Sequence, residues 1–154
     1  MSDIKTEFLC DFKADLDWAG TLNVGTTPHG ARSIICCNGG VIEGPKMKGE
    51  VLPGGGDWPT MRPDGSIVLD VRAAARMDDG QIVYTYYRGI STIRMDTLQA
   101  ILKGEAVDPS DYYFRTTPVF ETASEKYSWL NRIVAVGVGQ FLPTGVAYKV
   151  YAIL

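Results

Sequence analysis

The sequence has few of the residues that mark several common functional classes. It contains one histidine, His29, and three cysteines in 154 residues. A zinc site usually draws on several His or Cys ligands, so we expect no metal centre. Cys10, Cys36 and Cys37 are odd in number and form no Cys-x-x-Cys pair. We interpret them as structural thiols, with a nucleophilic Cys36 or Cys37 paired with His29 as the alternative.

Positive charge and long apolar runs are also scarce. Fifteen Lys and Arg stand against eighteen Asp and Glu, for a net charge of -3. The arginines are spread along the chain, whereas nucleic-acid binding requires clustered basic residues. The first segment, MSDIKTEFLCDFKADLDW, has no apolar run that would make a signal peptide or a membrane span. We therefore expect a cytoplasmic protein that binds neither nucleic acid nor a membrane.

Several catalytic motifs are missing. The sequence has no Gly-x-Gly-x-x-Gly between a strand and a helix, no phosphate loop, no Gly-x-Ser-x-Gly and no His-Glu-x-x-His. The glycine run 54–56 leads into Asp-Trp-Pro and not into a helix, so it is not a phosphate cradle. Nucleotide-dependent chemistry, serine hydrolysis and zinc proteolysis are not expected, and neither is a cofactor.

What the sequence does contain is a series of short β-type segments separated by Gly, Pro and Asp turns. Residues 1–154 form one domain by length. Segments rich in Val, Ile, Tyr and Thr alternate with turns such as RPDG and MDDG. They predict an all-β fold, a single closed antiparallel barrel of about eight to ten strands. One short helix is predicted around residues 96–103, capped by Asp96 and ended by Gly104.

The two turns bracket a predicted hairpin over residues 66–88. Its first strand, IVLDVRAAAR, alternates with period two, so Ile67, Leu69 and Val71 share an apolar face. Asp70 and Arg72 share the other face, which is either solvent or the wall of a hydrated cavity. We take the apolar face as an outer face, and we therefore expect a homo-oligomer, a dimer or higher. The last segment, GVAYKVYAIL, is expected to be a strand that runs to the C-terminus.

The stretch GEVLPGGGDWPTMRPDG raises two interpretations of Asp57 and Trp58. In the first, Asp57 accepts backbone N–H bonds in a turn and Trp58 covers the end of the core. In the second, the glycines let the backbone approach a ligand, with Trp58 as an apolar wall. A carboxylate held against a large ring is desolvated, which raises its pKa and suits it to proton transfer.

Other candidate site residues lie on or beside strands. His29, between Pro28 and Gly30, is either a polar turn residue or a general acid or base. Four arginines either pair with carboxylates on neighbouring strands or bind an anionic oxygen of a ligand, namely Arg32, Arg72, Arg88 and Arg115. Asp70 is an alternative base to Asp57. Four further side chains have two interpretations: they lie in the core or on the surface, or they form the wall of a ligand pocket. They are Tyr86, Tyr113, Trp129 and Asn131.

These motifs together resemble a known family. Six segments are similar, in this order, to those of the domain of unknown function 3237 family. They are GTTPHGARSI, GGVIEGPKMKGEVLPGGGDW, RPDGSIVLDVR, DDGQIVYTYYRG, VDPSDYYFRTTPVFET and YSWLNRIVAVGVG. They cover most of the chain. The resemblance implies a small closed antiparallel barrel of bacterial or fungal type, oligomeric and without a cofactor requirement. It implies no particular reaction.

The sequence thus favours a cofactor-independent enzyme that acts on a small aromatic or polyketide-like metabolite bound in the barrel. The reaction would be an isomerisation, cyclisation or lyase step by acid–base catalysis. Asp57 or Asp70 would move the proton, and Arg115 or Arg72 would stabilise the oxyanion. The alternative is a non-catalytic barrel that binds a small hydrophobic ligand, because a fold does not choose between these functions.

Overall fold

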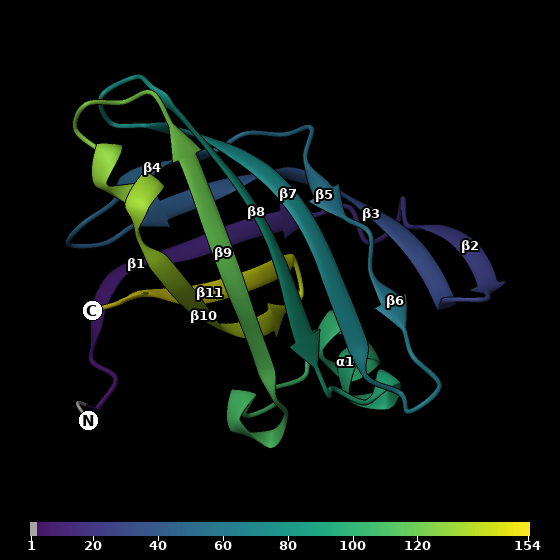
Figure 1. Cartoon of the computed structure of the whole chain (residues 1–154). Helices are drawn as coiled ribbons and strands as arrows, with labels where there is room; N and C mark the ends of the chain where they lie inside the picture. The colour runs from purple at the N-terminus through teal and green to yellow at the C-terminus, as the bar shows by residue number, and fades with distance from the viewer. Residues whose placement is uncertain (1–2) are drawn as a thin grey trace.

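Eight strands form a closed antiparallel barrel in the computed structural model, which describes residues 3–154 (Figure 1). The barrel closes because the first and the last strand in the spatial order given below pair with each other. The all-β barrel predicted from the sequence is confirmed. In spatial order the strands are β1 (Thr6–Leu16), β11 (Gly145–Ile153), β10 (Val134–Leu142), β9 (Phe114–Thr122), β8 (Ile82–Ser91), β7 (Ile67–Met77), β4 (Lys48–Val51) and β3 (Gly30–Glu43).

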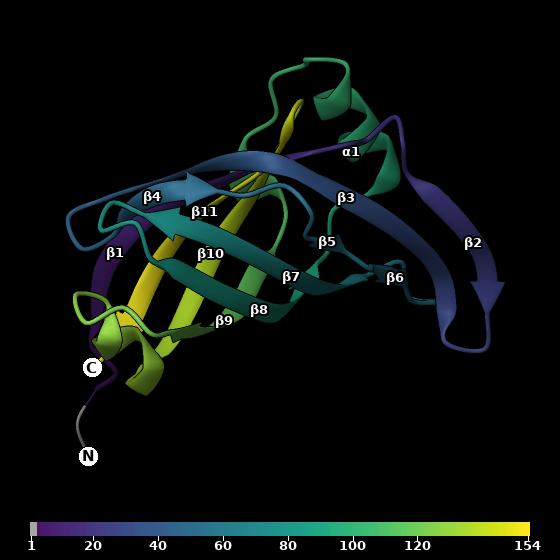
Figure 2. The same ribbon diagram turned by 90° about the horizontal axis from the view of Figure 1, so that it is seen from above.

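An arm extends the sheet beyond the barrel. It consists of β2 (Leu22–Thr27) and the first half of β3, which pair as a hairpin. Two short strands, β5 (Gly56–Asp57) and β6 (Thr60–Met61), join this part of β3 to β7. The arm bends toward the side on which the outer face of β7 and β8 lies, so that this outer face becomes concave (Figure 2).

The glycine run before β5 is explained by close approach of three strands. β5 lies between β3 and β7 and pairs with both. A Cβ atom on Gly55 would overlap the carbonyl of Arg72, and one on Gly56 would overlap the carbonyl of Ile35. Residues without a Cβ are therefore needed for the chain to pass between the two long strands.

The apolar face of β7 points into the barrel. Leu69, Val71, Ala73 and Ala75 are buried in the core, whereas Arg72 on the opposite face is exposed. The expectation that the Ile67, Leu69 and Val71 face is an outer, oligomer-forming surface is therefore wrong. The period of two placed these residues on one face, but only the closure of the sheet determines which face is inside.

Aromatic rings fill much of the interior. Phe114 is fully buried and stacks on Phe141 with ring centroids 4.6 Å apart. Tyr148 meets Phe114 edge-on at 5.4 Å and Tyr87 edge-on at 5.5 Å. Offset and edge-to-face contacts of this kind add to the stabilisation from burial alone. The rings come from strands β8 to β11, so they tie four neighbouring strands together across the lumen.

The helix α1 (Met95–Leu102) lies at the end of the barrel where β8 ends (Figure 1). It buries Leu98 and Ile101, and it ends as predicted at Gly104, whose N–H donates to the Ile101 carbonyl at 2.8 Å with φ +89. Asp96 is not the cap: the N-cap is Arg94, and the Asp96 side chain accepts from the Thr97 N–H. Within residues 3–154 no helix is long and apolar enough to span a membrane.

Two short 3-10 helices complete the fold, η1 (Pro109–Asp111) and η2 (Ser128–Arg132). The segment with Trp129 and Asn131 is thus helical and not the start of a strand, and β10 begins only at Val134. The Asn131 amide both donates to and accepts from the backbone of Thr122 at 2.9 Å. This pair of bonds holds η2 against the end of β9.

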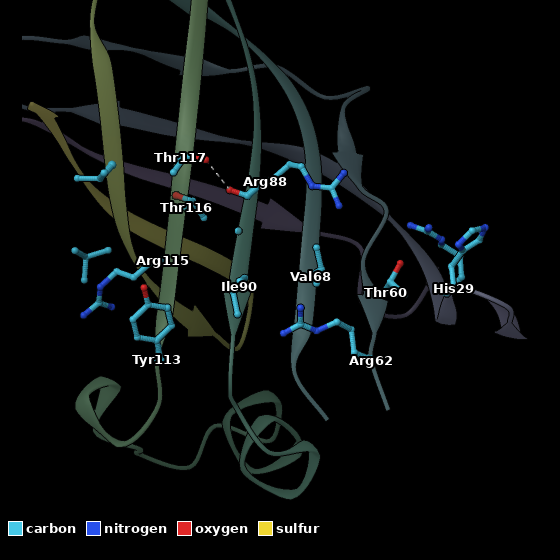
Figure 3. Close-up of a pocket in the computed structure, with 14 residues that line it drawn as sticks. His29, Thr60, Arg62, Val68, Arg88, Ile90, Tyr113, Arg115, Thr116 and Thr117 are labelled. Atoms are coloured by element: carbon cyan, nitrogen blue, oxygen red, sulfur yellow. Dashed lines mark hydrogen bonds between the residues drawn. The ribbon is translucent and has the colours of Figure 1, made fainter. Parts of the chain in front are cut away.

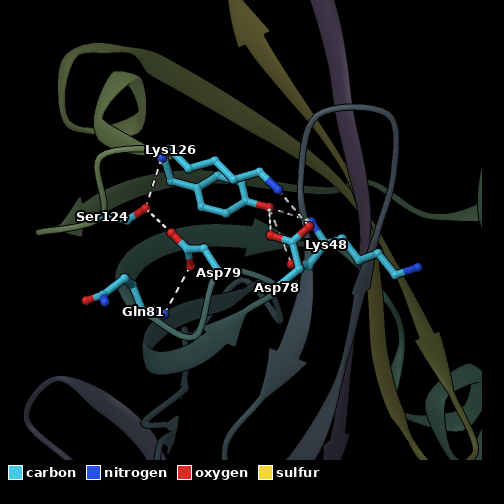
Figure 4. A network of polar contacts seen from close by, with 7 residues as sticks. Lys48, Asp78, Asp79, Gln81, Ser124 and Lys126 are labelled. Atoms are coloured by element: carbon cyan, nitrogen blue, oxygen red, sulfur yellow. Dashed lines mark hydrogen bonds and ion pairs between the residues drawn. The ribbon is translucent and has the colours of Figure 1, made fainter.

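A polar network fixes the predicted MDDG turn between β7 and β8 (Figure 4). Tyr127, which is buried, donates to Asp78 at 2.7 Å, and Lys126 pairs with the same carboxylate at 2.8 Å. The Ser124 hydroxyl donates to Asp79, which also accepts from the N–H of Gln81. Charge-assisted bonds from one segment therefore hold the turn at this end of the barrel.

We expect Phe114→Ala to lower the free energy of unfolding by about 3–5 kcal/mol, the usual cost of truncating a buried Phe. Tyr113→Ala is the matched control, because Tyr113 is the next residue but is 51% exposed. It should cost less than about 1 kcal/mol. Urea denaturation followed by far-UV circular dichroism would measure both. Equal losses in the two variants would contradict the assignment of faces.

Candidate functional site

The concave outer face carries a row of side chains that runs across six strands. Residues directly opposite in an antiparallel ladder project from the same face. Arg32 on β3 pairs with Thr60 on β6, Thr60 with Val68 on β7, and Val68 with Ile90 on β8. Ile90 pairs with Arg115 on β9, and the row ends at Val138 on β10. An apolar floor thus has an arginine toward each side.

A second row lies beside the first on the same face. Asp70 on β7 is opposite Arg88 on β8, and Arg88 is opposite Thr117 on β9. His29 lies at the tip of the arm, in the turn between β2 and β3. Because the arm bends forward (Figure 2), this histidine lines the same hollow as residues of the barrel strands (Figure 3).

Most of these side chains, but not Asp70, line an open groove of about 930 Å³ (Figure 3). This is the size of a pocket for a small organic ligand. Its lining contains four arginines and the single histidine of the chain, and it contains no aspartate or glutamate. The lining residues are His29, Arg32, Thr60, Arg62, Val68, Arg88, Gly89, Ile90, Tyr113, Arg115, Thr116, Thr117, Val136 and Val138.

Three of the four groove arginines have no carboxylate partner in the protein. Within residues 3–154, the side chains of Arg32, Arg88 and Arg115 have no carboxylate within 4.0 Å. Arg32 donates to the carbonyl of Trp58 at 2.6 Å. Arg115 donates to the carbonyl of Phe114 at 2.9 Å, and its guanidinium lies 4.9 Å from the ring centre of Tyr113.

Arg62 differs from these three. It donates to the Ser66 hydroxyl at 2.8 Å and lies 3.6 Å from the exposed carboxylate of Asp64. Asp70, although opposite Arg88 in the ladder, forms no ion pair with it. The groove therefore concentrates positive charge on a chain whose net charge is -3. A cleft of this kind attracts anions.

The interior of the barrel leaves little room for a ligand. The cavity that contains Asp57 has a volume of about 20 Å³ and is lined also by Cys37, Tyr87 and Tyr148. This is room for about one water molecule. The expectation of a metabolite bound inside the barrel is therefore wrong: core side chains fill the interior, and the large hollow lies on the outer face.

Asp57 belongs to this interior cluster and not to the groove. It lies opposite Ile35 and Val71, whose side chains point inward, and it is 9% exposed. Its carboxylate accepts a hydrogen bond from the Asp70 N–H at 3.0 Å. Burial raises the pKa of Asp57 to about 7, against the partial opposing effect of this bond. Burial also raises the pKa of Tyr87 and of Tyr148.

Several of the residues selected from the sequence lie outside the groove. Arg72 and Tyr86 stand in the next row of the outer face, with the guanidinium 5.4 Å from the ring centre. Trp58 is exposed near the arm. Trp129 packs against the core at η2, and Asn131 binds the backbone of β9. Of the predicted site residues, the structure brings His29, Arg88, Tyr113 and Arg115 together in the groove.

Sequence reasoning did not select several groove residues, namely Arg62, Thr60, Val68 and Ile90. It also missed Tyr87 and Tyr148 beside Asp57. No local motif marks any of them. The signal that would have found them is the strand register, which aligns residues far apart in sequence.

The lining contains one possible metal ligand, His29. In the described part of the chain, no group of three or more His, Cys, Asp or Glu side chains could hold a metal ion. The arrangement of the groove instead suits the binding of anionic oxygen atoms by guanidinium groups, beside an imidazole that could transfer a proton.

Comparison with known proteins identifies the family. The model of the DUF3237 family, described as proteins of unknown function, matches residues 4–153. The chain belongs to this family. A UPF0311 protein of Clostridium acetobutylicum is 43% identical over 124 residues, which are 80% of this chain and 78% of that protein.

Solved structures show the same barrel. A conserved protein of unknown function from Rhodopseudomonas palustris superposes with a TM-score of 0.91 at 32% identity, over all of both chains. A structure described as an enzyme from Penicillium herquei superposes with a TM-score of 0.74 at 21% identity, over 100% of this chain and 97% of that one. The second likeness concerns the fold alone.

Asp57 should make the stability of the protein depend on pH. Its pKa is about 7 in the folded protein, against an ordinary value of 3.8, so the folded state holds the proton more tightly. The free energy of unfolding should therefore fall as pH rises from about 4 to about 7, by on the order of 4 kcal/mol. Asp57→Asn should remove this part of the pH dependence and be the more stable protein at pH above about 7.

Urea denaturation of both proteins across this pH range would measure the difference. Glu105→Gln, at an exposed carboxylate, is the control and should keep the wild-type profile. A difference between wild type and Asp57→Asn that stays constant with pH would show that the carboxyl does not titrate as its burial implies.

Proposed function

We propose that the protein is a cofactor-independent acid–base enzyme that acts on a small aromatic or polyketide-like metabolite held in the outer groove. The reaction would be an isomerisation, cyclisation or lyase step. The observation that carries this proposal is the groove itself, whose lining combines the single histidine, four arginines and an apolar floor. Such a floor suits a ring system, and the arginines suit its anionic oxygens.

His29 is the proposed proton-transfer group. Histidine is the side chain that most often serves as a general acid or base, and His29 is exposed at the groove, where it can reach a bound ligand. In the proposed step, it removes a proton from the carbon next to a substrate carbonyl and returns it at another position. Asp70 is the second candidate base, because it stands on the same outer face directly opposite Arg88.

Arg88 is the proposed oxyanion-binding group, together with Arg115. Loss of a carbon-bound proton places negative charge on the carbonyl oxygen, and a guanidinium offers planar paired donors to that oxygen. The Arg88 side chain has no partner among residues 3–154, so its donors are available to a ligand. Fold likeness to the Penicillium herquei enzyme is consistent with catalysis but does not carry it, because one fold hosts many functions.

A non-catalytic ligand-binding role is the second candidate. The observation in its favour is that no carboxylate lines the groove, so none orients the His29 imidazole as in many acid–base enzymes. The same arginines and apolar floor would serve this role without a chemical step.

Solvent-deuterium exchange separates the two functions. The protein would be incubated in heavy water with a panel of aryl ketones, beginning with α-tetralone, and incorporation next to the carbonyl would be followed by mass spectrometry. We expect acceleration over buffer, with a loss of about 100-fold in His29→Gln, typical of removing a general base. Arg88→Gln should lose about tenfold or more, because the enolate oxygen loses a donor.

Asn131→Ala is the control for surface substitution, since Asn131 lies at η2 and away from the groove. It should keep the wild-type exchange rate. If Asp70→Asn abolishes exchange and His29→Gln does not, Asp70 is the base. If wild type binds the ketones without accelerating exchange, the ligand-binding role is the correct one.

A further inference from the structure

The positive groups of the groove form two separate clusters. Arg88 and Arg62 reach toward β7 on either side of Val68, and His29 lies beyond them on the arm (Figure 3). Arg32 on β3 of the arm lines the same part of the groove. We call these four side chains the arm-side cluster. Arg115 stands apart from them on β9, beside Tyr113 (Figure 3).

An apolar strip separates the two clusters. Val68 on β7 and Ile90 on β8 occupy successive positions of the row that leads to Arg115. Neighbouring strands are about 4.8 Å apart, so this strip is about 5–10 Å wide. Gly89, the residue before Ile90 on β8, also lines the groove and adds no side chain to the floor. The surface between the clusters can therefore accommodate aromatic rings lying against it.

Arg115 is held in a defined position. Its Nη1 donates to the Phe114 carbonyl and its guanidinium lies over the Tyr113 ring. These contacts use one donor and one face of the planar group, and they leave its remaining N–H donors for a ligand. A pre-positioned guanidinium loses less conformational freedom on binding than a mobile one.

Except for Arg62, which lies 3.6 Å from Asp64, the arginines of both clusters have no carboxylate partner within the described residues, and the groove lining contains no carboxylate. A ligand with one anionic group would neutralise one cluster and leave the other without a partner. A ligand with an anionic group at each end would satisfy both with charge-assisted hydrogen bonds.

We infer that the ligand of this protein is an elongated, largely aromatic molecule that carries an anionic oxygen group at each end. One group binds the arm-side cluster, the other binds Arg115, and the rings lie on the strip of Val68 and Ile90. This inference rests on the proposed function only in taking the groove as the binding site, and it does not require catalysis.

Calorimetric titration with three biphenyl acids tests the inference. The probes are biphenyl para,para′-dicarboxylate, with a carboxylate at each end; biphenyl para-carboxylate, with one; and diphenate, with two carboxylates near the ring junction. We expect the para,para′ diacid to bind at least about tenfold more tightly than the other two, since only it reaches both clusters.

Substitutions assign the two ends. Arg115→Gln should reduce the affinity for the para,para′ diacid about tenfold and reduce it less for the monoacid, which retains the arm-side cluster. Arg88→Gln should weaken both. Arg132→Gln, at an exposed arginine of η2, makes the same change in net charge and should leave all three affinities unchanged.

Three results would overturn the inference: equal affinity for the diacid and the monoacid, equal affinity for the para,para′ diacid and diphenate, or no binding of any probe. An unchanged diacid affinity in Arg115→Gln would also do so. Its failure is distinct from failure of the proposed function. Two-ended binding without deuterium exchange would leave the inference intact and remove catalysis. Accelerated exchange that is lost in His29→Gln, with equal affinities for the diacid and the monoacid, would leave catalysis intact and remove the inference.

Discussion

The pairing of β1 with β3 is the contact on which the rest of the structure depends. It joins Asp11–Leu16 to a segment of β3 between Cys37 and Glu43 and closes the sheet into a barrel. The approach is close: a Cβ atom on Gly40 would overlap the carbonyl of Lys13. Closure removes the exposed edges that an open sheet would present. It also determines that one face of every barrel strand is enclosed and must be packed.

Packing of that face accounts for the position of the ligand-sized hollow. A barrel of eight strands is narrow enough for side chains to fill its interior, and here aromatic rings from β8 to β11 do so. A buried carboxyl, Asp57, remains inside with a cavity of about one water molecule. The first half of β3 leaves the barrel, carries β2 with it and bends forward, so that the larger hollow forms outside.

The lining of this outer hollow is rich in positive charge, because it contains four arginines and one histidine and no carboxylate. Ion pairing alone does not set it apart: Lys126 pairs with Asp78 and Lys149 with Asp11, whereas Arg72 and Arg132 have no ion pair within the described residues. In the groove, Arg88 and Arg115 have no carboxylate partner within the described residues, although Asp70 is opposite Arg88 in the ladder. Positive charge that the protein does not neutralise is available to a ligand, which is the physical basis of the proposed function.

The sequence alone determined the local elements. Turn residues and period-two alternation predicted the hairpin of β7 and β8, the strand at the C-terminus, and the helix that ends at Gly104. The overall pattern and family motifs predicted the barrel. These features depend on local backbone preferences and on faces within one strand, which neighbouring residues set.

Only the tertiary structure decided which face of each strand is inside, and which distant residues share a row. Alternation grouped Leu69 with Val71, but closure of the barrel put them inward and left Val68 outside. Arg32, Val68 and Arg115 become neighbours through strand register alone. A register is a property of pairs of strands and of the closed sheet, so no single segment contains it.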